Sequence, residues 1–167
     1  LALLARRKRG EIATGVALAS GTCVKLFPVV LFPALYLRRS WKMALAFAAT
    51  IVVVYLPYLS VGPVGVLGSL PGYASERGMV NGEQYYLLAV ARRALGAQAP
   101  SSVYVIFAAA VLGVVAVWMI RNRSDDELRY LRNGLILASL FILLLAPHFS
   151  WYFTWLIPFL CFVPSLA

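Results

Sequence analysis

The chain has 167 residues, of which 62% are hydrophobic and only 13% are charged, and its mean hydropathy is +0.85. A soluble domain is about half apolar and a quarter charged. This composition therefore excludes a soluble domain and indicates an integral membrane protein. The net charge of +9 does not indicate nucleic-acid binding, because the basic residues fall in short blocks between apolar runs, as in cytoplasmic loops. We therefore expect a multi-pass protein of a bacterial plasma membrane, with bilayer lipids and no nucleic acid among its partners.

The first apolar run extends from residue 12 to residue 37 and has a basic block at each end. Because positively charged loops stay in the cytoplasm, both ends of the run should lie on that side. The run is too long for one straight span of about 20 residues and too short for two full ones. We therefore predict a hairpin of two short helices, 12–24 and 26–37, that meet near Lys25. A single tilted helix is the alternative, and it would leave one basic block on the wrong side.

Lys25 places a positive charge in the middle of this run, and Pro28 and Pro33 follow it. An ammonium at the bilayer centre costs about 2.5–3.5 kcal/mol on insertion scales, so such a residue is a functional candidate. Proline removes a helix donor, and a broken helix at membrane depth survives only where protein or a wet cavity lines it. A lysine that snorkels to the interface is the alternative. The central position favours a site in which the ammonium binds a lipid phosphate at the outer leaflet.

Four more apolar stretches complete the predicted membrane domain, which comprises residues 1–167. The predicted spans are 12–24, 26–37, 43–60, 103–120, 133–147 and 152–164. The cytoplasmic loops are then 5–11, 38–42 and 121–132, and the outer loop is 61–100. Pro147 ends the fifth span early, and Pro158 interrupts the last one. The predicted fold class is all-α: a polytopic membrane helix bundle with short, proline-broken helices.

The outer loop contains the densest polar cluster outside the cytoplasmic loops. Asn81 and Gln84 stand three apart, as the two members of a capping box do. Apolar residues then recur at helical spacing as far as Gly96, which predicts one amphipathic helix that is too short to span and lies on the outer membrane surface. Asn81, Glu83 and Tyr85 are candidate substrate-binding residues. A solvated loop without a binding role is an equally good interpretation.

A second candidate cluster follows the fifth span. His148 is the only histidine, and a pKa near neutrality would let its side chain hold a phosphate or exchange a proton. A lone interfacial histidine is, however, more often a plain hydrogen-bonding residue. Trp151 and Tyr152 are either aromatic-belt anchors or stacking platforms for a sugar or a prenyl chain. No spacing of Cys, His, Asp or Glu indicates a metal site, and no cofactor other than a lipid-linked donor is expected.

Two stretches of the chain resemble glycosyltransferase family 87, the polyprenol-phosphate-mannose-dependent mannosyltransferases. One stretch consists of Gly15-x-x-Leu18-Ala19 and Lys25-x-x-Pro28 between two basic blocks, and the other of Pro147-His-Phe-Ser-Trp-Tyr152 with Trp155 and Pro158. The resemblance implies a GT-C fold with an extracytoplasmic active site. It also implies a sugar, mannose or arabinose, that is carried on a polyprenyl phosphate and transferred to a lipid-linked or glycan acceptor. Lys25 would then face the donor phosphate, and His148 would lie near the reacting centre.

The sequence departs from the family pattern in its catalytic carboxylate, which in the family lies in the first outer loop. No Asp is predicted on the outer side, and Glu76 and Glu83 come too late in the chain to match. We therefore expect a fragment whose general base lies upstream of Leu1 and which is inactive alone. A transporter or lipid-phosphate flippase is the alternative, because broken helices also mark transport sites. A structural membrane subunit is a third class.

Overall fold

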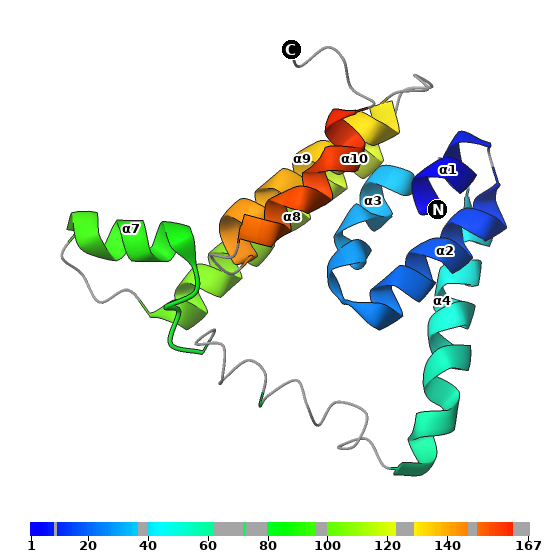
Figure 1. The fold of residues 1–167 in the computed structure, drawn as a ribbon, viewed down its shortest axis with the longest axis horizontal. Helices are drawn as coiled ribbons and strands as arrows, with labels where there is room; N and C mark the ends of the chain where they lie inside the picture. Colours follow the sequence, from blue (N-terminus) through cyan, green and yellow to red (C-terminus); the bar gives the residue numbers. More distant parts are fainter. Residues whose placement is uncertain are drawn as a thin grey trace.

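The computed structural model describes residues 1–8, 10–36, 40–61, 72, 80–95, 100–122, 129–146 and 150–161. Within these ranges the regular elements are helices, which confirms the predicted all-α fold (Figure 1). In chain order they are α1 (Ala2–Arg7), α2 (Glu11–Val24), η1 (Phe27–Leu31), α3 (Phe32–Leu35), α4 (Trp41–Tyr55), η2 (Leu56–Val61), α7 (Tyr86–Leu95), α8 (Ser101–Arg121), α9 (Arg129–Leu145), η3 (Ser150–Leu156) and α10 (Ile157–Leu160). Elements labelled η are 3₁₀ helices.

Among the described residues, two helical stretches are long and apolar enough to cross a membrane. One comprises the 18 residues of Trp41–Tyr58, which join α4 to the start of η2, and the other is α8, with 21 residues. At about 1.5 Å per residue, α8 extends roughly 31 Å, the thickness of a hydrocarbon core. Most of the apolar side chains on both stretches are exposed, as expected of helices whose solvent is lipid.

The first apolar run is broken at Lys25. α2 ends at Val24, Lys25 has an extended backbone with φ −146° and ψ 132°, and η1 begins at Phe27 with Pro28 in its first turn. The chain then returns beside α2 through η1 and α3 (Figure 1). The run therefore forms two helical arms rather than one tilted helix. The depth of these arms in a bilayer stays a prediction.

Small residues allow α2 and α4 to pack closely. A Cβ atom on Gly15 would lie 2.4 Å from the carbonyl oxygen of Met43 and 3.1 Å from the backbone nitrogen of Phe47. Ala19, one turn further along α2, is fully buried. Close approach of backbones through small residues is the usual way in which membrane helices associate. The Gly15-x-x-Leu18-Ala19 stretch is thus a helix-packing element of this fold.

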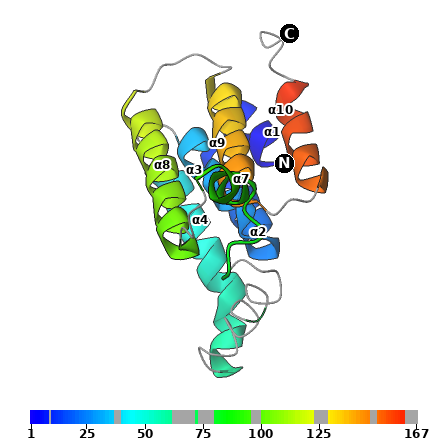
Figure 2. The same ribbon diagram turned by 90° about the vertical axis from the view of Figure 1, so that its left-hand side faces the viewer.

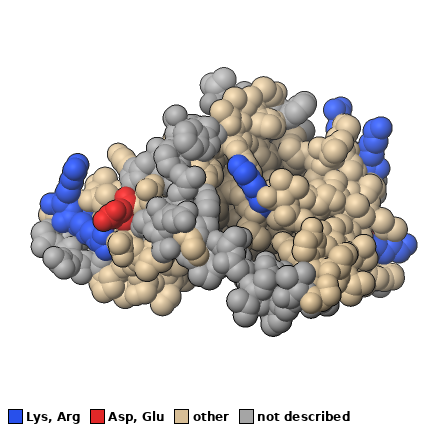
Figure 3. Space-filling model, turned by 60° about the horizontal axis from the view of Figure 1, so that its bottom comes forward, with Lys and Arg blue, Asp and Glu red and all other residues tan. Residues whose placement is uncertain are grey.

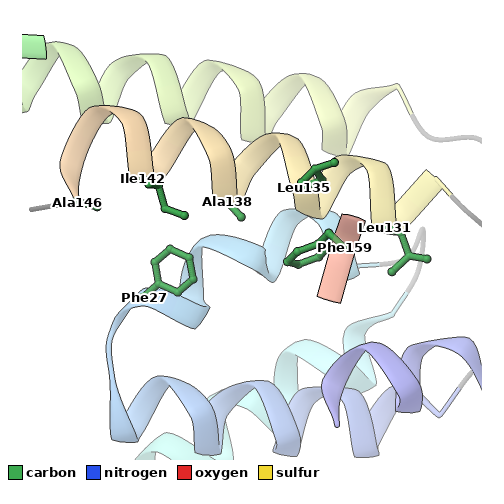
Figure 4. Close-up of a cluster of buried hydrophobic side chains, with 7 residues drawn as sticks. All are labelled: Phe27, Leu131, Leu135, Ala138, Ile142, Ala146 and Phe159. Atoms are coloured by element: carbon green, nitrogen blue, oxygen red, sulfur yellow. The ribbon is translucent and has the colours of Figure 1, made fainter. Parts of the chain in front are cut away.

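Helix α9 provides the main core of the molecule. Its buried stripe, together with the two rings that pack on it, consists of Leu131, Leu135, Ala138, Ile142, Ala146, Phe27 and Phe159 (Figure 4). Gly134 makes room for the Phe159 ring, because a Cβ atom there would lie 2.6 Å from the ring carbon Cε1. We call the break between α2 and η1 the Lys25 turn. The C-terminal half of α9 packs against the end of this turn, and its N-terminal half packs against α10 (Figure 4).

Helix α7 extends across the direction of α8 and α9, and Figure 2 shows it end-on in front of them. Leu88 is buried on its inner side, whereas Tyr86 and Val90 are exposed. An amphipathic helix is therefore present in the predicted place, and its contact with the membrane surface stays a prediction. The capping-box prediction is wrong: α7 begins at Tyr86, and the carbonyl group of Tyr85, not that of Asn81, accepts the first helical hydrogen bond, from Ala89.

The structure also differs from the predicted elements near the chain's C-terminal end. Helix α9 begins at Arg129, inside the predicted loop, because Leu131 is buried and Tyr130 packs under Arg6. The predicted last span is a 3₁₀ helix followed by the short α10, and residues 162–164 lie outside the described part. Pro158 does not interrupt a helix but stands in the first turn of α10, where its missing N–H leaves no hydrogen bond unmade.

Candidate functional site

The Lys25 turn is held closely against the end of α2. The backbone N–H of Lys25 donates to the carbonyl oxygen of Gly21 at 3.0 Å. The ring of Pro28 covers Gly21, where an added Cβ atom would lie 3.5 Å from Pro28 Cγ. The Lys25 side chain is exposed, and its Nζ atom lies 5.6 Å from the centroid of the Trp155 ring. This distance is typical of a cation–π interaction.

Four aromatic side chains from three elements meet beside the ammonium group. We call Phe27, Phe141, Tyr152 and Trp155 the aromatic cluster. The Phe27 ring meets Trp155 edge to face at 4.2 Å between centroids and Phe141 at 4.7 Å, and Tyr152 lies 6.4 Å from Trp155. Phe27 is only 8% exposed. The cluster therefore joins η1, α9 and η3, and Lys25 stands at its edge.

The charge on Lys25 has no carboxylate partner within the described ranges, where Glu11 and Glu83 are the acidic residues. Glu11 stands in the first turn of α2, about 20 Å along the helix from Lys25 at 1.5 Å per residue. Basic side chains gather at both ends of this face of the molecule, and one isolated basic side chain stands on the mostly uncharged surface between them (Figure 3). An indole face holds an ammonium group without neutralising it, so the N–H donors of Lys25 can still bind an anion.

The predicted outer-loop residues form the turn that leads into α7. Gly82 has a φ of 75°, and a Cβ atom there would lie 2.6 Å from Leu88 Cδ2. The carbonyl oxygen of Asn81 accepts a hydrogen bond of 3.1 Å from Arg92 Nη1, and the side chain of Glu83 is exposed. A left-handed conformation at a crowded position explains the glycine in this turn.

Tyr85 packs where α7 meets α8. Its ring is only 7% exposed and lies 5.4 Å from that of Tyr104, whose hydroxyl group donates to the carbonyl oxygen of Leu144 at 2.9 Å. Burial raises the pKa of the Tyr85 phenol. The contacts of Tyr85 are those of a packing residue, and its predicted role in substrate binding has no support from them.

The C-terminal half of α9 joins two groups of candidate residues: the aromatic cluster with Lys25, and the turn that leads into α7, which we call the α7 turn. Phe141 contacts the aromatic cluster, and the carbonyl group of Leu144 holds Tyr104 beside the α7 turn. Of the predicted site residues, the structure brings Lys25 and Tyr152 to one cluster and places Asn81, Glu83 and Tyr85 in the other group. His148 and the side chain of Trp151 lie outside the described residues. Within the described part, no three His, Cys, Asp or Glu side chains gather as metal ligands would.

Comparison with protein-family models decides the family. The model of glycosyltransferase family 87 matches residues 1–147, which is most of the chain. The chain belongs to glycosyltransferase family 87. No curated protein and no solved structure matches it.

Membership of glycosyltransferase family 87 implies a membrane glycosyltransferase, with lipid-linked sugar donor and acceptor substrates in general terms. The matched residues include the Lys25 turn and the α7 turn. Trp155, which lies against Lys25 and Phe27, and Tyr152 beside it come after the last matched residue. The aromatic cluster therefore joins the matched region to the segment that follows it.

The sequence did not predict that Phe27 and Phe141 belong to the aromatic cluster or that Tyr104 lies beside the α7 turn. Phe27 is two residues from Lys25, which was a local signal, but nothing in the sequence indicated which aromatic rings would meet it. The Tyr104 hydroxyl group binds a carbonyl at the end of a helix 40 residues away, and that carbonyl has no signature in the sequence.

Proposed function

We propose that this member of family 87 is a GT-C-like transferase that moves a sugar, mannose in the first instance, from a polyprenyl-phosphate donor to a hydroxyl group of a lipid-linked or glycan acceptor. The reaction takes place on the extracytoplasmic side of a bacterial plasma membrane. The observation that carries the proposal is the Lys25 ammonium group. It stands at a helix break in an apolar hairpin, lies against an indole ring and has no acidic partner among the described residues.

Lys25 acts on the donor phosphate. The acceptor oxygen attacks C1 of the sugar, the bond from C1 to the phosphate oxygen breaks, and the phosphate leaves with the electron pair. A cation fixed beside the leaving oxygens stabilises the charge that develops on them. Transfer by a single displacement inverts the configuration at C1.

The acceptor hydroxyl group must lose its proton to a base, and a carboxylate is the expected one. Neither described carboxylate fits this role, because Glu11 stands near the basic residues of α1 and Glu83 comes too late in the chain to match the family's carboxylate. Because the family's carboxylate lies in the first outer loop, we propose that the base lies upstream of Leu1 and that residues 1–167 alone do not catalyse transfer. His148 then lies near the reacting centre, Trp151 and Tyr152 contact the sugar or the prenyl chain, and Asn81 and Glu83 contact the acceptor.

The arrangement of basic residues supports this sidedness. Arg6 at the first basic block lies over the ring of Tyr130 at the start of α9, 5.4 Å from its centroid. The C-terminal end of α8, with Arg121, lies toward the same end of the bundle in Figure 1, whereas the Lys25 turn and α7 lie toward the other end. The positive-inside rule then supports an outer position for the Lys25 turn, although α7 also carries Arg92 and Arg93 at that end.

The test is transfer of radiolabelled mannose from polyprenyl-phosphate-mannose by the full-length protein in membranes. We expect Lys25→Ala to lower the transfer rate about a hundredfold, as removal of a donor to a developing anion does, and Lys25→Arg to retain part of it. Lys42→Ala is the matched control, since Lys42 is an exposed lysine in the first turn of α4. Wild-type activity in Lys25→Ala would contradict the role of Lys25. Movement of the lipid across the bilayer without sugar transfer would favour the flippase.

A further inference from the structure

The Lys25 side chain ends on a feature that the proposed function does not use, the face of Trp155. The two residues are 130 positions apart, and Trp155 belongs to η3. A lysine side chain carries its charge on a flexible stem of four carbons, so the charged group has no fixed position unless a contact holds it. Among the described residues, Trp155 provides the side-chain contact of the ammonium group, at 5.6 Å from the ring centroid.

The Trp155 ring is itself fixed by the turn that carries Lys25. Phe27 presents its ring to Trp155 at 4.2 Å with an interplanar angle of 87°, and Phe141 supports Phe27 from α9 at 4.7 Å and 65°. Edge-to-face packing restricts the rotation of each ring. Trp155 therefore touches the turn twice, at the Phe27 ring and at the Lys25 ammonium group.

From this geometry we propose that Trp155 is the positioning residue for Lys25: it holds the ammonium group where the donor phosphate binds and leaves its charge available. The proposal rests on the proposed function. A carboxylate in the same place would bind the ammonium more strongly but would compete with the phosphate for it. An indole face attracts the cation and competes for none of its hydrogen bonds with the anion. Trp155 thus determines how tightly the phosphate binds, without touching it.

The first arm of the test detects the contact itself. Reductive ¹³C-methylation of the full chain in nanodiscs gives each lysine a dimethylammonium signal, and Lys25→Arg identifies that of Lys25. We expect the Trp155 ring current to move this signal upfield, Trp155→Phe to retain part of the shift and Trp155→Leu to abolish it. Trp118→Leu, which removes an exposed indole from α8, should leave the signal in place. An unshifted Lys25 signal in the wild-type protein would overturn the proposal.

The second arm measures the Kd for polyprenyl phosphate. Loss of a cation–π contact should weaken binding about five- to tenfold in Trp155→Leu and less in Trp155→Phe. In a Lys25→Ala background, Trp155→Leu should cause no further loss, because the two residues act through one interaction. An additive loss would show that Trp155 acts through packing, and it would overturn the positioning role. Trp118→Leu, which removes an exposed indole from α8 outside the aromatic cluster, is the control and should leave the Kd unchanged.

The two arms separate the inference from the function on which it rests. If the wild-type protein shows the shifted Lys25 signal but does not bind polyprenyl phosphate, Lys25 does not bind the phosphate of the sugar donor. The role of Trp155 in positioning Lys25 for that phosphate is then also wrong. If it binds polyprenyl phosphate through Lys25 but the signal is unshifted, the function stands and the role of Trp155 is wrong.

Discussion

At the scale of single residues, two glycines show how closely side chains control the packing of this protein. Gly134 faces the Phe159 ring, whereas Gly113 on α8 has no atom within 4 Å of an added Cβ atom. The same substitution should therefore have opposite results at the two positions. Helix propensity does not explain the difference, since alanine is a better helix former than glycine at both positions.

We predict that Gly134→Ala destabilises the protein by about 1–3 kcal/mol, because the new methyl group displaces the Phe159 ring. Gly113→Ala should leave the stability unchanged or raise it slightly. The measurement is thermal unfolding of the purified protein in detergent. Equal melting temperatures for the two variants would contradict the packing of α10 on α9.

A second prediction concerns the Tyr104 hydroxyl group, which donates to the carbonyl oxygen of Leu144. Tyr104→Phe should cost about 0.5–1.5 kcal/mol in the free energy of unfolding, as loss of one hydrogen bond does. Tyr58→Phe is the matched control, because the Tyr58 side chain is exposed. A Tyr104→Phe variant as stable as wild type would show that this bond does not tie α8 to α9.

At the scale of elements, the α2–α4 crossing depends on Gly15. Gly15→Ala should destabilise the protein by about 1–3 kcal/mol, since its Cβ atom would meet the Met43 carbonyl oxygen, a backbone atom that cannot move aside alone. Gly21→Ala in the same helix is the control, because its nearest neighbour is Pro28 at an ordinary contact distance. Unfolding in graded denaturant would measure both. Similar stabilities would place the helices further apart than the structure does.

The elements that the sequence predicted well are those with local signals. Lys25 and Pro28 mark the break after α2 because charge and proline act within one helical turn. The predicted cytoplasmic loop 121–132 contains the start of α9, because an arginine such as Arg132 can face water from a helix while Leu131 beside it is buried.

The contacts that define the candidate site could not be predicted in this way. Trp155 reaches Lys25 across 130 residues, and Phe141 meets Phe27 across more than a hundred. Partners so distant in sequence depend on how whole helices pack, and hydrophobic periodicity does not specify this. Lys25 and Trp155 stand in the two stretches that resemble the family, but the resemblance does not indicate that their side chains are in contact.

At the scale of the whole molecule, we expect α8 to lie in lipid and α7 to lie on the membrane surface. A nitroxide at Val114, exposed in the middle of α8, should be shielded from a water-soluble relaxation agent and accessible to oxygen. A nitroxide at Val90, exposed on α7, should show intermediate values, typical of the headgroup region. Full accessibility of both sites to the water-soluble agent would contradict the membrane placement.

Whether Lys25 receives the phosphate of a lipid-linked donor can be measured by comparing the binding of polyprenyl phosphate with that of neutral polyprenol. The two lipids differ only in the anion. We predict that the wild-type protein binds the phosphate at least tenfold more tightly than the alcohol, that Lys25→Arg retains much of this preference, and that Lys25→Ala abolishes it. An undiminished preference for the phosphate in Lys25→Ala would contradict this role of Lys25.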